Sequence, residues 1–203
     1  MSKPSVLLFD LGGVLVDWAG IDPLLALTQG RLDPEQARKF WLESPAVRDF
    51  ETGRCGAGEF AAAAVAGLRL DCPPEDFLAQ LESWDRGPFP GAAELLAELA
   101  PHYFLACLSN NNELHWRRLW REHPHFLDRF QRLFASFEIG KIKPDPDIFE
   151  YVLAQLRVPP GAVLFFDDNI ECVEAARRQG MRACQTKGVA AVRAALGKLS
   201  ESP

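Results

Sequence analysis

The sequence predicts an α/β protein in which a parallel sheet is covered by helices and a small helical domain is inserted after the first strand. Val6–Phe9 is a short, continuous apolar run with turn residues directly after it, which is typical of a strand buried on both faces of a parallel sheet. From about Tyr103 onward, similar apolar runs alternate with segments of helical periodicity. This alternation indicates βαβ units and therefore a Rossmann-like core.

The core elements follow from this alternation in chain order. The predicted strands are Val6–Phe9, Phe104–Leu108, Phe134–Phe137, Val163–Phe166 and Arg182–Cys184. The predicted helices of the second part are Glu113–Arg121, Asp147–Leu156, Ile170–Gln179 and Val189–Leu196.

The segment between Trp18 and Trp84 shows no strand-like alternation. It contains start signals of helices instead, with an acidic residue or proline at the expected first positions. These signals are Asp22-Pro23, Asp33-Pro34 and Pro73-Pro74-Glu75. Pro88–Gly91 is rich in turn formers and is predicted to be the return hinge. The expected division is therefore a core of residues 1–17 and 89–203 and a helical cap of residues 18–88.

Composition excludes several classes of protein. A net charge of −6 argues against a nucleic-acid or membrane surface, because both attract clustered Lys and Arg. The five cysteines are scattered and form no C-x-x-C pair, so neither a disulfide framework nor a zinc site is indicated. The sequence has no signal-peptide core and no apolar run long enough to span a bilayer. A cytoplasmic protein is expected, and the oligomeric state is not predicted.

Polar side chains stand where predicted strands end or shortly afterwards. They are Asp10, Ser109, Lys143, Asp167 and Asp168. In an open α/β sheet such strand ends gather in one crevice where the strand order reverses, so residues remote in sequence can share a site. Carboxylates, a hydroxyl and a lysine together indicate Mg²⁺ and a phosphate group, since Mg²⁺ prefers oxygen ligands and Lys binds phosphate as a point charge.

With these residues assembled, the chain resembles the haloacid dehalogenase-like (HAD) superfamily, specifically its members with a helical C1-type cap after motif I. Four motifs in the right order carry the resemblance over essentially the whole length. They are Phe9–Val14 (motif I), Leu108–Asn110 (motif II), Lys143–Pro146 (motif III), and Phe166–Asn169 with Ala175-Ala176 and Gly180-Met181 (motif IV). Gly12-Gly13 and Leu108–Trp116 are similar to the branch of bacterial sugar-phosphate phosphatases that act on α-D-glucose 1-phosphate.

The resemblance implies a role for each acidic residue. Asp10 matches the nucleophile that attacks phosphorus and becomes a phosphoaspartate. Mg²⁺ would be held by Asp10, Asp168 and the backbone carbonyl of Gly12. Asp167, one position earlier, is expected to lie behind these ligands and to act through them. The implied substrate is a small phosphorylated metabolite, which no motif identifies further.

The resemblance also assigns the groups that would bind phosphate. Ser109 would offer its hydroxyl, and Asn110 belongs to the same motif and is expected to contact the substrate. Lys143 would add a positive charge where negative charge grows in the transition state. In the cap, Arg54 follows the turn glycine Gly53. Since caps of this superfamily often lower such a loop into the site, Arg54 is either a substrate contact or an exposed surface residue.

Motif I departs from the pattern of the superfamily at Gly12. Members of the superfamily usually have a second aspartate there, two residues after the nucleophile, which acts as general acid and base. Proton transfer of this kind is worth ~10²–10⁴ in rate, so its loss would weaken a phosphatase without abolishing attack by Asp10. Two alternatives to a phosphatase remain open: a metal-independent 2-haloacid dehalogenase, and a binding protein that kept the fold and lost its chemistry.

The motifs leave the roles of three further residues open. Asp17 either braces the loop into the cap or takes part in catalysis. His115 is expected to be structural, because it falls in a helix beside Trp116 and has no visible acidic partner. Cys172 replaces a polar residue usual in motif IV, with an unknown effect.

Overall fold

The computed structural model describes residues 3–200, so the expected core boundaries at residues 1 and 203 lie outside this range. A five-stranded sheet with the order β5-β4-β1-β6-β7 forms its centre. Every neighbouring pair of these strands is parallel. The strands are β1 (Val6–Phe9), β4 (Phe104–Ser109), β5 (Arg132–Ala135), β6 (Val163–Asp167) and β7 (Arg182–Gln185). The predicted α/β fold is confirmed.

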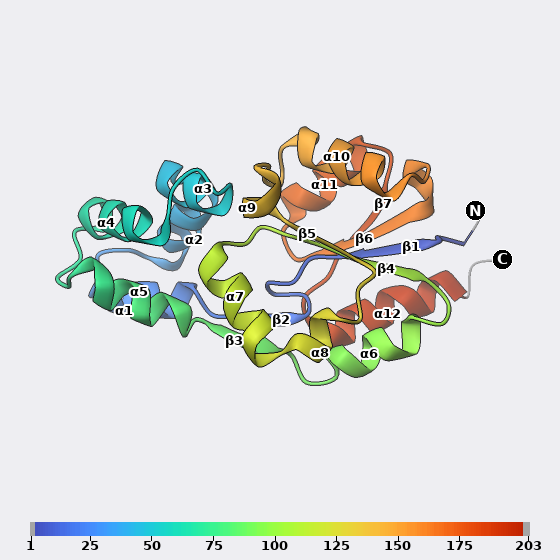
Figure 1. Cartoon of the computed structure of the whole chain (residues 1–203), viewed down its shortest axis with the longest axis horizontal. Helices are drawn as coiled ribbons and strands as arrows, with labels where there is room; N and C mark the ends of the chain where they lie inside the picture. Colours follow the sequence, from blue (N-terminus) through green and yellow to red (C-terminus); the bar gives the residue numbers. More distant parts are fainter. Residues whose placement is uncertain (1–2, 201–203) are drawn as a thin grey trace.

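Helices cover both faces of the sheet (Figure 1). Side chains alternate along β1, with Leu7 and Phe9 in one apolar cluster and Val6 and Leu8 in the other, as the period of two in a strand requires. The first face carries α6 (Ala92–Leu99), α7 (Glu113–Glu122), α8 (Pro124–Leu127) and α12 (Gly188–Ser200). The second face carries α10 (Pro146–Leu156) and α11 (Ile170–Arg178). A short 3₁₀ turn, η1 (Pro160–Ala162), precedes β6.

The predicted strand Phe134–Phe137 is shifted in the structure. Strand β5 ends at Ala135, and a short helix, α9 (Ser136–Ile139), begins at Ser136. The buried hydroxyl of Ser136 accepts the N–H of Asn111 at 2.9 Å and donates to the carbonyl of Asn111 at 3.0 Å. Phe137 is apolar because its ring packs on Trp116, 6.5 Å between centroids. The apolar run therefore continues past the strand for a reason unrelated to the sheet.

The inserted segment is helical, as expected. It consists of α1 (Ile21–Leu27), α2 (Pro34–Glu43), α3 (Pro45–Glu51), α4 (Ala57–Leu68) and α5 (Pro74–Glu82). Asp33 caps α2 through the N–H of Gln36 in a capping box, whereas α1 begins one residue before Asp22, which lies in its first turn. Aromatic rings fill the interior of this segment, and Phe50 and Phe60 stack at 4.6 Å.

A two-stranded antiparallel ribbon joins the cap to the core, and sequence analysis did not predict it. Its strands are β2 (Val16–Trp18) and β3 (Asp85–Pro88). Val16 pairs with Pro88 and Trp18 with Asp85, with a register shift between the two pairs. The predicted hinge at Pro88–Gly91 therefore begins inside a strand. Each strand is only three or four residues long, and the two are separated in sequence by the whole insertion. A local sequence pattern therefore does not reveal this ribbon.

The cap helices lie beyond the carboxyl ends of the parallel strands, on the side opposite the chain termini (Figure 1). The crevice where polar strand ends gather is thus the side of the core that the cap faces. None of the helices within residues 3–200 has the length and apolar character that crossing a bilayer would need.

Candidate active site

The candidate site lies at the carboxyl end of β1, the central strand of the sheet. From β1 the chain goes first to β4 and β5 on one side, and then to β6 and β7 on the other. This is the switch point where open α/β sheets bind ligands. Asp10 follows β1 and donates its N–H to the carbonyl of Phe166 at 2.8 Å. Ser109 and Asp167 are the last residues of the flanking strands.

Lys143 is at the centre of the charged groups. Its Nζ donates to Oδ1 of Asp10 at 2.8 Å and to Oδ2 of Asp167 at 2.7 Å. All three side chains are buried. Burial alone would lower the pKa of Lys143, but the two carboxylates outweigh it and raise that pKa well above its usual value. The site therefore keeps a positive charge beside the predicted nucleophile.

Asn110 holds the backbone of Lys143 on both sides. Its Oδ1 accepts the N–H of Lys143, and its Nδ2 donates to the carbonyl of Lys143, both at 2.9 Å. The side-chain amide is thus engaged with the protein and fixes the lysine that pairs with Asp10. The structure gives Asn110 this positioning role, and its expected contact with the substrate stays a prediction.

Asp10, Asp167 and Asp168 form the acidic cluster. One oxygen from each lies within 4.8 Å of the others, a spacing at which the three could hold a metal ion. Asp167 is the least free of them, because Lys143 binds its Oδ2 and the N–H of Asn169 binds its Oδ1 at 2.8 Å. The place of Asp167 behind the metal ligands remains a prediction.

Gly13 provides room for Asp168. Its φ is +74°, and a Cβ at this position would lie 2.5 Å from Oδ2 of Asp168. The carboxylate of Asp168 therefore occupies the space above the glycine, next to the loop that carries Gly12 and Asp10. Hard carboxylate oxygens facing a backbone turn form a donor set that fits Mg²⁺.

The carboxylates share this small volume at an electrostatic cost. Burial raises the pKa of Asp10 to about 7, Lys143 opposes this, and the neighbouring carboxylates add to it. Burial and the charge of Asp167 also raise the pKa of Asp168, while Lys143, Lys187 and Arg38 lower it. A divalent cation between these groups would favour their ionised forms.

Ser109 lies on the opposite side of Asp10, at the end of β4. Its side chain is buried, and its hydroxyl makes one long hydrogen bond, 3.3 Å to the carbonyl of Asn110. Helix α7 begins four residues later and is capped by the side chain of Asn112. Ser109 is therefore close to the nucleophile with a hydroxyl that is only weakly engaged, and its contact with phosphate remains a prediction.

Gly12 leaves the position of the usual general acid without a side chain. A Cβ built there meets only Trp18 Cβ, at 3.8 Å, which is ordinary contact distance. The glycine is thus not required by close packing, and a carboxylate could be introduced at this position.

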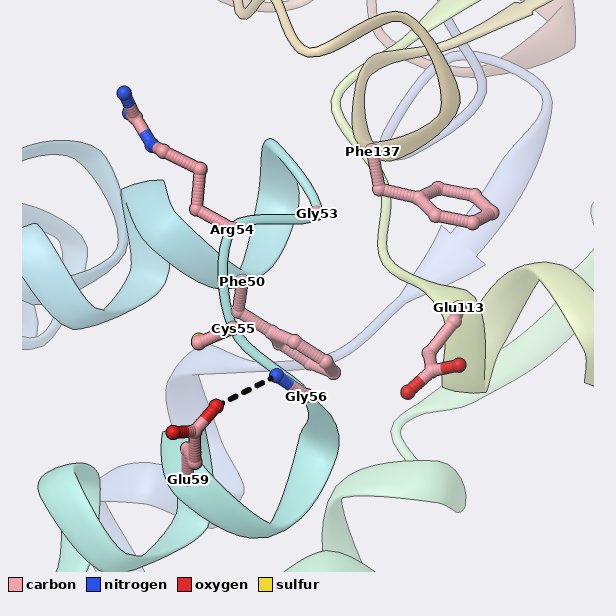
Figure 2. A pocket seen from close by; sticks show the side chains of 8 residues that line it. All are labelled: Phe50, Gly53, Arg54, Cys55, Gly56, Glu59, Glu113 and Phe137. Carbon is pink, nitrogen blue, oxygen red and sulfur yellow. Dashed lines mark hydrogen bonds between the residues drawn. The ribbon is translucent and has the colours of Figure 1, made fainter.

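A cleft of about 330 Å³ opens between the cap and the core, and its walls do not include the residues of the charged cluster. Figure 2 shows Phe50 and the turn of Gly53 on the cap side and Phe137 and Glu113 on the core side. The guanidinium of Arg54 points away from this cleft (Figure 2) and pairs with Asp49 at 3.0 Å. The structure therefore does not bring Arg54 to the charged cluster, and its expected role as a substrate contact remains untested.

The three ambiguous residues are placed as follows. Asp17 lies on β2 and pairs with Arg86 of β3 at 3.7 Å, which fits a brace at the base of the cap. His115 is buried between Asn112 and the carbonyl of Leu81, 2.7 Å from its Nε2, so it connects α7 to the cap helix α5. Cys172 is buried in the apolar cluster under α11, where its thiol replaces a polar group.

Two cap residues near the site were not singled out from the sequence. Arg48 forms an ion pair with Asp145, two residues after Lys143. Asp145 is the N-cap residue of α10, but its side chain makes no capping hydrogen bond. Glu51 is partly buried and feels the charges of Lys143 and Asp10. The spacing of Arg48 and Glu51 by three residues was the available signal, because it places both on one helix face.

Known proteins resemble the chain over most of its length. Residues 4–180 match the family described as haloacid dehalogenase-like hydrolase. A phosphatase of Mycobacterium tuberculosis is 29% identical over 186 residues, which cover 88% of this chain and 85% of that protein. The D-ribitol-5-phosphate phosphatase of Bacteroides thetaiotaomicron is 24% identical, covering 88% and 90%.

The fold is similar to that of solved structures as well. A HAD family enzyme of Bacteroides thetaiotaomicron, in complex with magnesium and inorganic phosphate, superposes with a TM-score of 0.74. Its sequence is 24% identical, and the match covers 91% of this chain and 95% of that one. A parallel sheet with an inserted cap is therefore shared at low sequence identity.

Proposed function

The chain belongs to the haloacid dehalogenase-like hydrolases, and from this we propose that it is a Mg²⁺-dependent phosphatase that hydrolyses a small phosphomonoester. The proposal includes Asp10 as the nucleophile and a phosphorylated sugar or polyol as the substrate. The core of residues 1–17 and 89–203 would supply the phosphate site, and the cap of residues 18–88 would select the substrate.

One observation supports the proposal above the others. Asp10, Asp167 and Asp168 bring their oxygens within 4.8 Å of one another, and Lys143 bridges two of them at hydrogen-bond distance. A dehalogenase that works without metal has little use for such a cluster, whereas a phosphatase must neutralise phosphate beside a carboxylate nucleophile. A binding protein without chemistry would have no reason to hold a buried nucleophile and a lysine together.

The residues of the site would act in two displacements. In the first, an oxygen of Asp10 attacks phosphorus, the bond from phosphorus to the leaving oxygen breaks, and that oxygen takes up a proton, giving a phosphoaspartate and an alcohol. In the second, water attacks the same phosphorus, and the bond to Asp10 breaks to release phosphate. Lys143 stays charged throughout and stabilises negative charge on the phosphoryl oxygens, and Ser109 donates its hydroxyl to one of them.

Asp10, Asp168 and the carbonyl of Gly12 would hold the metal. When bound, Mg²⁺ would offset the repulsion between Asp10 and the phosphate and polarise the phosphoryl group. Asp167 keeps Lys143 and the loop at Asn169 in place. The cap would close over the bound substrate and exclude water.

The substrate class is supported by relatives rather than by any single residue. One similar protein bears the name of a D-ribitol-5-phosphate phosphatase and another that of a phosphatase. The cleft between cap and core, about 330 Å³ in volume with polar and aromatic walls, has room for a small polar metabolite.

The test is a panel of phosphomonoesters and 2-haloacids, assayed with Mg²⁺ and with a chelator. We expect phosphate release that the chelator stops and Mg²⁺ restores. Asp10→Asn should lower turnover by at least ~10³-fold, because the nucleophile is lost. Asp128→Asn is the matched control, since Asp128 is an exposed residue after α8 and should keep full activity.

Two results would contradict the proposal. Release of halide from a 2-haloacid in the presence of chelator would identify a dehalogenase. Full phosphatase activity in Asp10→Asn would show that the nucleophile lies elsewhere.

A further inference from the structure

In the proposed reaction, motif I does not supply the usual proton donor. The leaving oxygen of a sugar phosphate is a poor anion, so it needs a proton as its bond to phosphorus breaks. The usual donor position, Gly12, has no side chain. Asp167 has both oxygens engaged by Lys143 and the N–H of Asn169, and Asp17 pairs with Arg86 on the ribbon.

Glu51 is a carboxylic acid that the cap brings to the same place. It is the last residue of α3, three positions after Arg48, so both side chains lie on the same face of this helix. Val47 and Phe50 are buried in the cap interior, and Glu51 also follows Val47 by four positions, so it lies at the border of the buried face. Arg48 pairs with Asp145, which follows Lys143 by two residues. Glu51 therefore lies on α3 between the Arg48–Asp145 pair and the buried interior of the cap, on the part of the helix that borders motif III.

The chain just after Glu51 is also fixed to the core. Gly53 has a φ of +69°, and a Cβ there would collide with the carbonyl oxygen of Phe137. The hydroxyl of Thr52 donates to the carbonyl of Arg48 at 2.6 Å. Glu51 thus lies between two points at which the cap contacts the core, the Arg48–Asp145 pair and the approach of Gly53 to α9.

The surroundings of Glu51 suit a proton donor. Within residues 3–200 its carboxyl group has no hydrogen-bond or ion-pair partner, although the side chain is partly buried. Withdrawal from water raises the pKa of Glu51 to about 8, Lys143 opposes the rise, and Asp10 adds to it. A general acid near neutral pH needs a pKa in this range.

We propose that Glu51 is the general acid and base of this hydrolase, in place of the carboxylate that motif I lacks at Gly12. This proposal rests on the phosphatase activity proposed above. Glu51 donates its proton to the leaving oxygen while the bond between that oxygen and phosphorus breaks, and an alcohol departs. The resulting carboxylate then accepts a proton from the water that attacks the phosphoaspartate. The bond from phosphorus to Asp10 breaks, and Glu51 is again protonated for the next cycle.

The test compares leaving groups, because an acid matters only where the leaving oxygen needs a proton. In Glu51→Gln, kcat/KM for the best alkyl phosphate of the panel should fall by ~10²–10⁴-fold. For para-nitrophenyl phosphate, whose anion leaves readily, it should fall by less than ~10-fold, since the first step needs no proton. A burst of nitrophenolate should precede a slow steady state, because loss of the base slows hydrolysis of the phosphoaspartate.

Two further variants make the test decisive. Glu43→Gln is the matched control, as Glu43 is an exposed cap residue that pairs with Lys39, and it should retain wild-type values for both substrates. Glu51→Gln combined with Gly12→Asp should recover at least ~10-fold of the lost activity on the alkyl phosphate, since the Cβ of residue 12 has room. Circular dichroism and thermal unfolding would verify that each variant is folded.

The outcomes separate the two proposals. An equal fall in kcat/KM for both substrates in folded Glu51→Gln, or no fall for the alkyl phosphate, would overturn the role of Glu51 and leave the phosphatase proposal standing. If the wild-type protein hydrolyses no phosphomonoester at all, both proposals are overturned.

Discussion

The core holds its charged groups in contact with one another, whereas the cap meets the site through one short helix and a turn. Lys143, Asp10 and Asp167 are buried and joined by hydrogen bonds of 2.7 to 2.8 Å. On the cap side, Arg48 and Asp145 form an ion pair with side chains 47% and 37% exposed. Breaking the buried network of the core costs much free energy, whereas breaking the exposed ion pair of the cap costs little.

This difference suggests a division of labour. Phosphoryl transfer requires a geometry that does not change, and the ends of packed parallel strands provide it. Admission of a substrate requires movement, which a helix held by exposed contacts permits. If Glu51 supplies the proton, the reaction on poor leaving groups becomes complete only when the cap is in place. The following predictions test this comparison, beginning with the largest effect.

Lys143→Met should damage both stability and catalysis. Loss of the ammonium leaves two buried carboxylates without their partner, which we expect to lower the free energy of unfolding by ~3–5 kcal/mol. The kcat/KM for para-nitrophenyl phosphate should fall by at least ~10²-fold. Denaturant titration in chelator measures the change in stability, and steady-state kinetics measure the change in kcat/KM.

Lys141→Met is the control, because Lys141 pairs with a half-exposed Asp147. This substitution should lower the free energy of unfolding by less than ~1 kcal/mol. Similar stability of the two variants would contradict the view of the core as a tightly coupled network.

Gly13→Ala should weaken metal binding. Gly13 and Gly30 have nearly the same φ, +74° and +76°, but only a Cβ at Gly13 would reach Asp168. Alanine at either position should cost ~1–2 kcal/mol of stability through the left-handed backbone. Only Gly13→Ala should also raise the Mg²⁺ concentration for half-maximal activity, by ~10–100-fold. An unchanged Mg²⁺ requirement would remove Asp168 from the predicted ligands.

Glu51→Gln should be more stable than the wild type in alkaline solution. The pKa of Glu51 is raised from 4.5 to about 8 on folding, so above pH ~5 the unfolded chain releases a proton that the folded protein retains. Wild-type stability is therefore lost progressively as the pH rises through this window, and the variant does not suffer this loss. We expect the variant to gain ~1–2 kcal/mol at pH 8 and little at pH 4.5, measured by denaturant titration in chelator. An equal difference at both pH values would mean that Glu51 is not withdrawn from water.

Arg48→Met should have the smallest effect on stability and act mainly on substrate binding. The ion pair with Asp145 is exposed, so its loss should change the free energy of unfolding by less than ~1 kcal/mol. Because it joins the cap to motif III, KM for an alkyl phosphate should rise several-fold. Lys39→Met removes a similar surface pair, 3.5 Å from Glu43 and within α2, and should leave KM unchanged. A large loss of stability in Arg48→Met would show that the cap is held more rigidly than proposed.

Sequence analysis predicted those features of this protein that local sequence patterns determine. The strands of the core were predicted to within two residues, because apolar runs buried on both faces have a clear composition. The gathering of Asp10, Lys143 and the acids of motif IV followed from the general rule for strand ends in α/β sheets. The family motifs at these positions further reduced the number of candidate site residues.

What the sequence did not reveal depends on contacts across the chain. The ribbon of β2 and β3 joins short segments separated by the whole cap. Asn110 was expected to contact the substrate, yet its amide is engaged by the backbone of Lys143, a contact between residues 33 apart. Glu51 and Arg48 gained their interest only when α3 was seen to face motif III. In each case the decisive partner lies in another element of the fold.

The ribbon also bears on how such proteins diversify. Val16 and Pro88 are paired, so the chain returns to the core beside the point at which it left. An insertion whose ends meet in this way can be lengthened, shortened or exchanged while the sheet keeps its strand order and its connections. Evolution, or an engineer who grafts a foreign cap at these two residues, could therefore change which molecules are admitted without rebuilding the machinery beneath.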